Sequence, residues 1–170
     1  MSEGVDFVIN ILGVKGIPIV CLKDDSRAGY VGDALYDSDG KVCGFTVESM
    51  GFSLRKKMIP LDEILRINDK NCIIYSEKSI VRIEREGGIH KKCSYEKMIG
   101  KNVENHDGKG IGVVKDVVFD IETGEISGFE LTRGFMEDTV GGRRIIYFND
   151  GVEFGKEFIV AGRKNANEKS

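Results

Sequence analysis

The chain has 170 residues, of which 41% are hydrophobic and 31% charged, and its formal net charge is −3. This composition is typical of a folded globular protein and excludes the disordered and collagen-like classes. Because a protein that binds phosphates usually carries a basic excess, the acidic balance also argues against a nucleic-acid partner.

The sequence contains no apolar run of about 18 residues, the length that a membrane-spanning helix requires. Its first residues lack the basic and apolar regions of a signal peptide, so we expect a cytoplasmic protein without a membrane span. In that reducing compartment the four cysteines are expected to be free thiols. No two of them are closely spaced, so we predict small buried apolar side chains rather than a zinc site. They are Cys21, Cys43, Cys72 and Cys93.

Two stretches of the chain follow nearly the same pattern, residues 29–45 and residues 112–129. Each contains a hydrophobic strand that ends in aspartate, a turn that contains glycine, and a second strand that begins with valine or isoleucine. The chain has 22 glycines and only two prolines. Glycine between short runs of Val, Ile, Phe and Tyr is typical of short strands joined by tight turns. We therefore predict an all-β fold built from a tandem repeat.

The first copy is expected to span residues 14–78. Pro60 is expected to begin a short helical turn, after which Ile64 and Leu65 return to the core. A strand over residues 72–75 is predicted to close the unit.

One glycine in each copy interrupts the alternation of apolar side chains along a strand. Val42, Phe45 and Val47 are spaced by three and then two residues, whereas strict alternation needs steps of two. An extra residue at Gly44, and at Gly128 in the second copy, restores the register as a β-bulge does. The alternative is that these glycines only admit a closely packed neighbour.

Residues 79–97 are predicted to be a linker, with residues 80–83 as an added edge strand. The second copy is expected to span residues 98–162, with a closing strand at residues 158–160. The polar tail, residues 163–170, is expected to be disordered.

The ordered motifs resemble the PRC-barrel family, in tandem. They are an aspartate-hydrophobic-aromatic-aspartate segment at residues 33–37 and 116–120, and basic residues before an apolar strand at residues 55–60 and 143–146. The resemblance covers residues 14–160. It implies two small PRC-type β-barrels, each of about five or six short antiparallel strands with a short helical turn.

The resemblance implies an adaptor or assembly module. The family includes proteins similar to the cytoplasmic domain of the photosynthetic reaction centre H subunit and to the C-terminal domain of a ribosome maturation factor. A shared fold does not transfer either function, so the specific role stays open. The second copy departs from the family pattern after Ile146, where Tyr147 replaces the usual proline.

No set of residues suits catalysis. Histidine, the commonest general base, occurs only at His90 in the linker and His106 in a turn. His90 and Cys93 are three residues apart, but two such residues on a polar linker are more commonly solvated than metal-bound. Four repeated aspartates are either acid/base groups or turn caps, and their place beside turns favours capping. They are Asp33, Asp37, Asp116 and Asp120. We therefore expect a non-enzymatic protein with no catalytic residue, cofactor or metal.

Two exposed loops, residues 48–57 and 132–144, are predicted to contact a partner protein, of which a second copy of the chain is one option. The second loop combines arginine, acidic and apolar side chains, a composition common at protein interfaces. These residues are Arg133, Phe135, Met136, Glu137, Asp138, Arg143 and Arg144. The alternative is a solvated loop whose Phe135 caps the barrel end. A second hypothesis is RNA or ribosome association through basic residues. They are Arg55, Lys56 and Lys57, together with Arg143 and Arg144.

Overall fold

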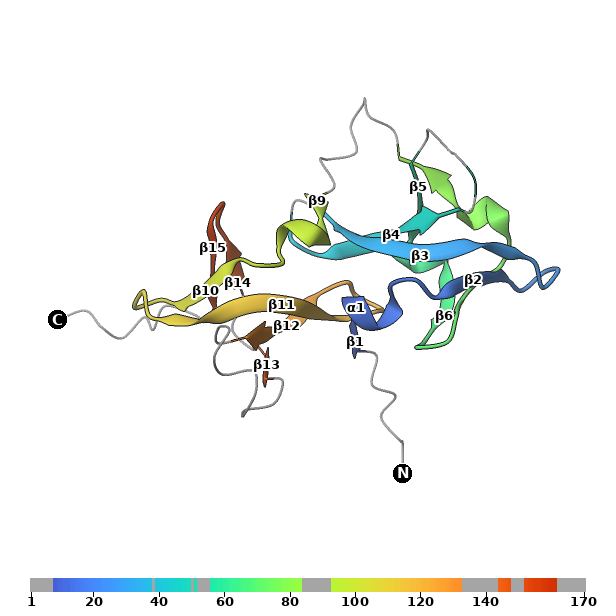
Figure 1. The fold of residues 1–170 in the computed structure, drawn as a ribbon. Helices are drawn as coiled ribbons and strands as arrows, with labels where there is room; N and C mark the ends of the chain where they lie inside the picture. The colour runs from blue at the N-terminus through green and yellow to red at the C-terminus, as the bar shows by residue number, and fades with distance from the viewer. Residues whose placement is uncertain are drawn as a thin grey trace. The chain divides into compact units, whose positions relative to one another are not determined.

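The computed structural model has the all-β fold that the sequence predicts (Figure 1). It describes residues 8–37, 39–49, 51, 56–83, 93–132, 144–147 and 152–161. The chain divides into two compact units. Unit 1 comprises Met1–Glu96 and Phe119–Ile126, and unit 2 comprises Lys97–Val118 and Ser127–Ser170. The predicted disordered tail lies outside the described residues. No helix in the described part of the chain is long and apolar enough to cross a membrane.

Unit 1 is built on one sheet with the strand order β6-β7-β2-β3-β4-β5-β8, and β9 pairs with β3. Figure 1 shows β2, β3 and β4 side by side. Strand β2 runs parallel to β7, and the other neighbours are antiparallel. The strands are β2 (Pro18–Cys21), β3 (Arg27–Tyr36), β4 (Val42–Glu48), β5 (Lys57–Pro60), β6 (Ile64–Ile67), β7 (Cys72–Ile74), β8 (Val81–Arg82) and β9 (Cys93–Ser94). The short elements are β1 (Val8–Asn10), α1 (Ile11–Val14), η1 (Leu61–Glu63) and η2 (Glu77–Ser79).

Unit 2 repeats this pairing pattern with the order β13-β12-β11-β10-β15-β14. Strand β10 runs parallel to β15, as β2 does to β7, and antiparallel to β11. The strands are β10 (Asn102–Asn105), β11 (Gly110–Asp120), β12 (Ile126–Thr132), β13 (Arg144–Tyr147), β14 (Val152–Phe154) and β15 (Phe158–Ala161), preceded by η3 (Tyr95–Lys97).

Several local predictions for the first copy are confirmed. Pro60 immediately precedes the 3-10 turn η1, and the last predicted strand is β7. The register of β3 and β4 shifts so that β4 carries one extra residue, Cys43, beside Gly44. This is the predicted bulge. A side chain at Gly44 would also collide with the backbone of Ile59. The glycine therefore both accompanies the bulge and admits a closely packed neighbour.

The prediction that Leu65 returns to the core is wrong, because its side chain is 56% exposed. Ile64 pairs with Ile74 and Arg66 pairs with Ile73, so Leu65 is the extra residue of a bulge in β6. A bulged residue has no partner on the neighbouring strand. Its side chain therefore need not follow the alternation between the buried and the exposed face of the sheet.

The turn that joins β11 to β12 belongs to unit 1, although the rest of both strands belongs to unit 2. Val42 N–H donates to the carbonyl oxygen of Gly124 at 2.8 Å. The rings of Phe45 and Phe119, both fully buried, lie with centroids 6.0 Å apart. Lys41 Nζ lies 3.1 Å from Glu125 Oε1. The second copy thus contributes an aromatic side chain to the core of unit 1.

Candidate functional site

Most of the predicted contact loop lies outside the described residues, which end at residue 132 and resume at residue 144. Of its predicted contact residues, only Arg144 is described, as the first residue of β13, paired with Leu131. In the basic run, Arg55 also lies outside the described residues. Lys56 and Lys57 are exposed, and Lys57 lies opposite Arg82 on β8.

A hollow of about 480 Å³ opens where β4 ends and β5 begins, inside the first predicted contact loop. It is lined by strand ends and by η2, and its charged lining residues are two lysines and two glutamates. The lining residues are Ala28, Val47, Glu48, Ser49, Gly51, Lys56, Lys57, Glu77 and Ile80. The hollow is therefore a polar site that carries both signs of charge.

Gly29 sets the close approach of β3 and β4 on one side of this hollow. A Cβ atom there would lie only 2.7 Å from the carbonyl oxygen of Glu48 and 3.0 Å from Val47 Cγ1. Its φ of 139° is also one that L side chains rarely adopt. Glycine at this position therefore lets the end of β4 lie against β3.

A second cluster of polar side chains surrounds Asp33, which lies on β3. Ser94 Oγ on β9 donates to Asp33 Oδ2, and Lys15 Nζ lies 3.0 Å from Glu96 Oε1. Asp33 Oδ1 is buried and has no hydrogen-bond partner within the described ranges. Burial raises the pKa of Asp33 above its ordinary value of 3.8, and the negative charge of Glu96 acts in the same direction. The hydrogen bond to Glu96 is the main cause of the raised pKa of Lys15, to which Glu48 also contributes.

Replacing Asp33 by asparagine is expected to stabilise the protein against urea at pH 7. A carboxyl whose pKa is raised by folding contributes stability that is present below its unfolded pKa and lost as pH rises through its folded pKa. The advantage of Asp33→Asn should therefore shrink as pH falls toward 3.8. Asp24→Asn is the control, and we expect it to lower the stability against urea at pH 7. The reason is that the hydrogen bond from the Ser26 side chain lowers the pKa of Asp24. Equal urea midpoints for wild type and Asp33→Asn at every pH would contradict the prediction.

The other repeated aspartates divide into two kinds. Asp37 Oδ1 accepts from the N–H of Asp39 at 2.9 Å, and Asp120 Oδ1 accepts from the N–H of Glu122 at 2.8 Å. These two confirm the capping interpretation. Asp116, like Asp33, lies inside a strand, and its Oδ1 accepts from the N–H of Val117 at 2.7 Å. The position beside a turn therefore predicts the role of only the last aspartate of each motif.

The described residues offer no arrangement that indicates metal or thiol chemistry. No group of three or more potential ligands gathers among them. Cys21 and Cys72 are buried as predicted, and Cys43 is half-buried. Burial raises the pKa of Cys72 to about 12, which keeps it a thiol at neutral pH. His106 lies exposed in the turn between β10 and β11, and His90 lies outside the described residues.

Comparison with known proteins finds a family model that matches part of the chain. Residues 91–165 match the PRC-barrel domain. The chain is also similar to the uncharacterized protein YrrD of Bacillus subtilis (strain 168), with 28% identity over 151 residues. This similarity covers 86% of the chain and 83% of YrrD.

The PRC-barrel match extends from β9 through β15 and includes the predicted loop at residues 132–144. The first copy, residues 14–78, lies outside the match, so its membership of the PRC-barrel family stays a prediction. Its sheet nevertheless has the same parallel pairing of first and last strands as the matched copy.

Sequence reasoning missed an exposed apolar area on unit 1, at the ends of β2 and β7. Leu22 and Tyr75 are each 58% exposed. The signal was present, because residues 17–22 and 72–75 are apolar at every position. A strand that is apolar on both faces is usually covered on both faces. Such a run therefore predicts either a second covering layer or an exposed apolar surface.

Proposed function

We propose that this protein is a non-enzymatic adaptor, a tandem PRC-barrel that binds another protein in the cytoplasm. The observation that carries the proposal is the hollow beside β4 and β5, where Glu48 and Glu77 share the lining with Lys56 and Lys57. Protein segments carry charges of both signs, so a lining of both signs suits them. Residues 91–165 match the PRC-barrel domain. This match supports a binding role only indirectly, because the resemblance to that family implies an adaptor module.

The same lining disfavours the RNA hypothesis. Polyanion binding depends on the sum of many phosphate contacts to basic side chains. Here the two described lysines of the basic run are accompanied by two glutamates in one hollow. A site of balanced charge gains little from a uniformly negative ligand.

Site-specific photocrosslinking tests the proposal. A photoreactive amino acid at Ser49, in the hollow, is expected to capture a specific protein in the cells that naturally produce the chain. Asp107, which is exposed in the turn between β10 and β11 and does not line the hollow, is the matched control position. Capture of RNA alone, or of the same proteins from both positions, would contradict the proposal. Turnover of a substrate by the purified protein would contradict its non-enzymatic part.

Reversing the two lysine charges should weaken this capture. We expect Lys56→Glu/Lys57→Glu to lower the crosslinked yield from Ser49 by about fivefold or more, since like charges across an interface oppose binding. The control is Lys70→Glu, which reverses an exposed lysine in the turn between β6 and β7. An unchanged yield with the double variant, measured by quantitative mass spectrometry, would remove the hollow as the binding site.

A further inference from the structure

Four strands of unit 1 place two arginines at the ends of one row of side chains. In the register of the sheet, Arg27 on β3 lies opposite Val20 on β2. Val20 lies beside Ile73 on β7, and Ile73 lies opposite Arg66 on β6. Residues paired across neighbouring strands project from the same face. Both arginines are exposed, and the two apolar residues between them are half-buried. The row therefore reads Arg-Val-Ile-Arg on one face of the sheet.

Apolar side chains extend this row toward one end of the strands. Leu22 follows Val20 by two residues and Tyr75 follows Ile73 by two, so each continues the same face. The ladder between them also continues, because Leu22 N–H donates to the carbonyl oxygen of Ile74 at 2.8 Å. Leu22 and Tyr75 are more than half exposed. The centre of the face is thus an exposed patch of aliphatic and aromatic side chains.

The charge on this face is positive at its ends. Strands β2, β6 and β7 contain no aspartate or glutamate. The Arg27 guanidinium lies 5.6 Å from the centroid of the Tyr30 ring and donates to Tyr30 Oη at 3.1 Å. Glu48, an acidic residue on β4, lies opposite Tyr30 in the sheet. Asp24, in the turn before β3, accepts hydrogen bonds from Ser26. An arginine held against an aromatic ring loses little freedom on binding.

We propose that this face binds an extended segment of a partner protein that carries an acidic side chain on either side of an apolar one. Three inter-strand spacings separate Arg27 from Arg66, so their Cα atoms lie about 14 Å apart. An extended peptide advances about 3.4 Å per residue, and alternate side chains point to the same side. Carboxylates about four residues apart would therefore reach both arginines, with the residue midway between them on Val20 and Ile73.

Protein is favoured over nucleic acid by the two residues that lie between the arginines, Val20 and Ile73. Single-stranded nucleic acid binds through aromatic stacking along a basic groove, whereas here the side chains between the two arginines are aliphatic. Arginine and tyrosine around an apolar centre are typical of protein hot spots. The inference rests on the proposed function of protein binding, but it uses residues that do not line the hollow.

Selection from a phage-displayed library of random peptides tests the inference on the full chain. We expect enriched peptides to contain two acidic residues about four positions apart with an apolar residue between them. A synthetic peptide of that sequence should bind about a hundredfold more weakly to Arg27→Gln/Arg66→Gln, since each of the two lost charge-assisted hydrogen bonds contributes about 1.5 kcal/mol or more. Fluorescence anisotropy measures the affinity, which should also fall as salt rises.

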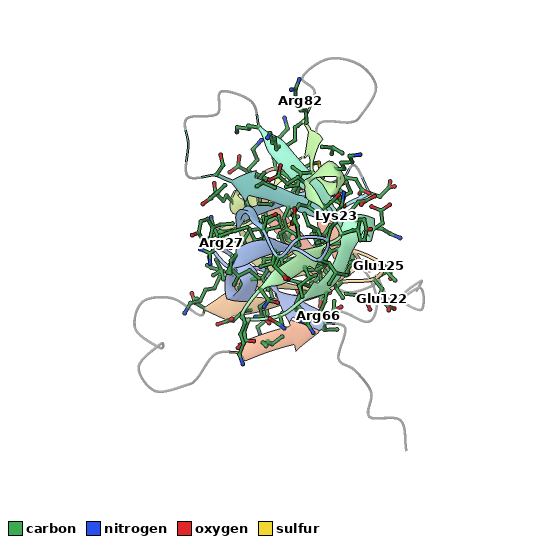
Figure 2. The ribbon with its side chains drawn as sticks, turned by 90° about the vertical axis from the view of Figure 1, so that its right-hand side faces the viewer. Lys23, Arg27, Arg66, Arg82, Glu122 and Glu125 are labelled. Atoms are coloured by element: carbon green, nitrogen blue, oxygen red, sulfur yellow. The ribbon has the colours of Figure 1, made fainter. Side chains whose placement is uncertain are left out.

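Arg82→Gln is the matched control and should bind the peptide as wild type does. Arg82 is exposed on β8 and lies away from Arg27 and Arg66 in Figure 2. No enrichment, enriched peptides without the acidic pair, or equal binding to the double variant would overturn the inference. So would a wild-type dimer that the double variant makes monomeric, or an RNA oligonucleotide that binds wild type but not the double variant. Because photocrosslinking at Ser49 uses a different surface, its result shows separately whether the proposed function fails.

Discussion

Replacing Gly124 by alanine is expected to lower the free energy of unfolding of unit 1 by about 2 to 4 kcal/mol. Two costs combine at this position. Gly124 has a φ of 73°, where a residue with a Cβ atom is strained. A Cβ atom there would also collide with the carbonyl oxygen of Val42, a backbone atom that no rotamer change can move. The hydrogen bond from Val42 N–H to the carbonyl oxygen of Gly124 holds the turn in that place.

Gly16→Ala separates the two costs. Gly16 lies in another turn of unit 1 with a similar φ of 83°, but a Cβ atom there would meet nothing within 4 Å. We expect it to cost only about 1 to 2 kcal/mol, the strain of the left-handed conformation. Urea unfolding followed by tyrosine fluorescence reports mainly on unit 1, because only Tyr147 of the five tyrosines lies in unit 2. Equal losses of unfolding free energy in the two variants would show that the turn at Gly124 does not pack against Val42.

Phe119→Ala should destabilise unit 1 by about 3 to 5 kcal/mol, the usual cost of removing a buried phenylalanine. Phe119 is 0% exposed and lies in the part of the second copy that belongs to unit 1. Its ring faces Phe45 at a 54° interplanar angle, a tilted geometry favourable for aromatic pairs. The same tyrosine-monitored unfolding measures the loss.

The control for Phe119→Ala is Leu65→Ala on β6 of the same unit, where the side chain is 56% exposed. We expect that change to cost less than about 1 kcal/mol. A double-mutant cycle with Phe45→Ala should give a coupling of about 0.5 to 1.5 kcal/mol between the two rings. A coupling near zero, or equal costs at Phe119 and Leu65, would contradict the contribution of the second copy to the core of unit 1.

Elements of the fold that depend on neighbouring residues could be predicted from the sequence. Asp37 and Asp120 cap the turns that follow them, and Pro60 precedes a helical turn. The bulge beside Gly44 was visible as a break in apolar alternation. In each case the interacting groups lie within a few residues, so the order of residues is enough.

The site could be predicted only in part. Lys56 and Lys57 were identified as exposed basic residues, and they do line a hollow, but Glu77 arrives from a segment twenty residues further along. Asp33 and Asp37 belong to the same motif, yet Asp33 lies inside β3 and meets Ser94 instead of capping a turn. Motif position could not reveal this difference because the contact joins residues that are distant in the chain.

The sequence alone determined the all-β architecture and the places of the turns, since these depend on local periodicity and turn chemistry. Only the tertiary structure decided that Gly124 and Phe119 complete unit 1, and that Arg27 and Arg66 end one row of side chains. The reason is strand register. It brings together residues from distant segments through backbone hydrogen bonds, which nearly every residue type can make, so the residues of one strand do not say which distant strand pairs with it.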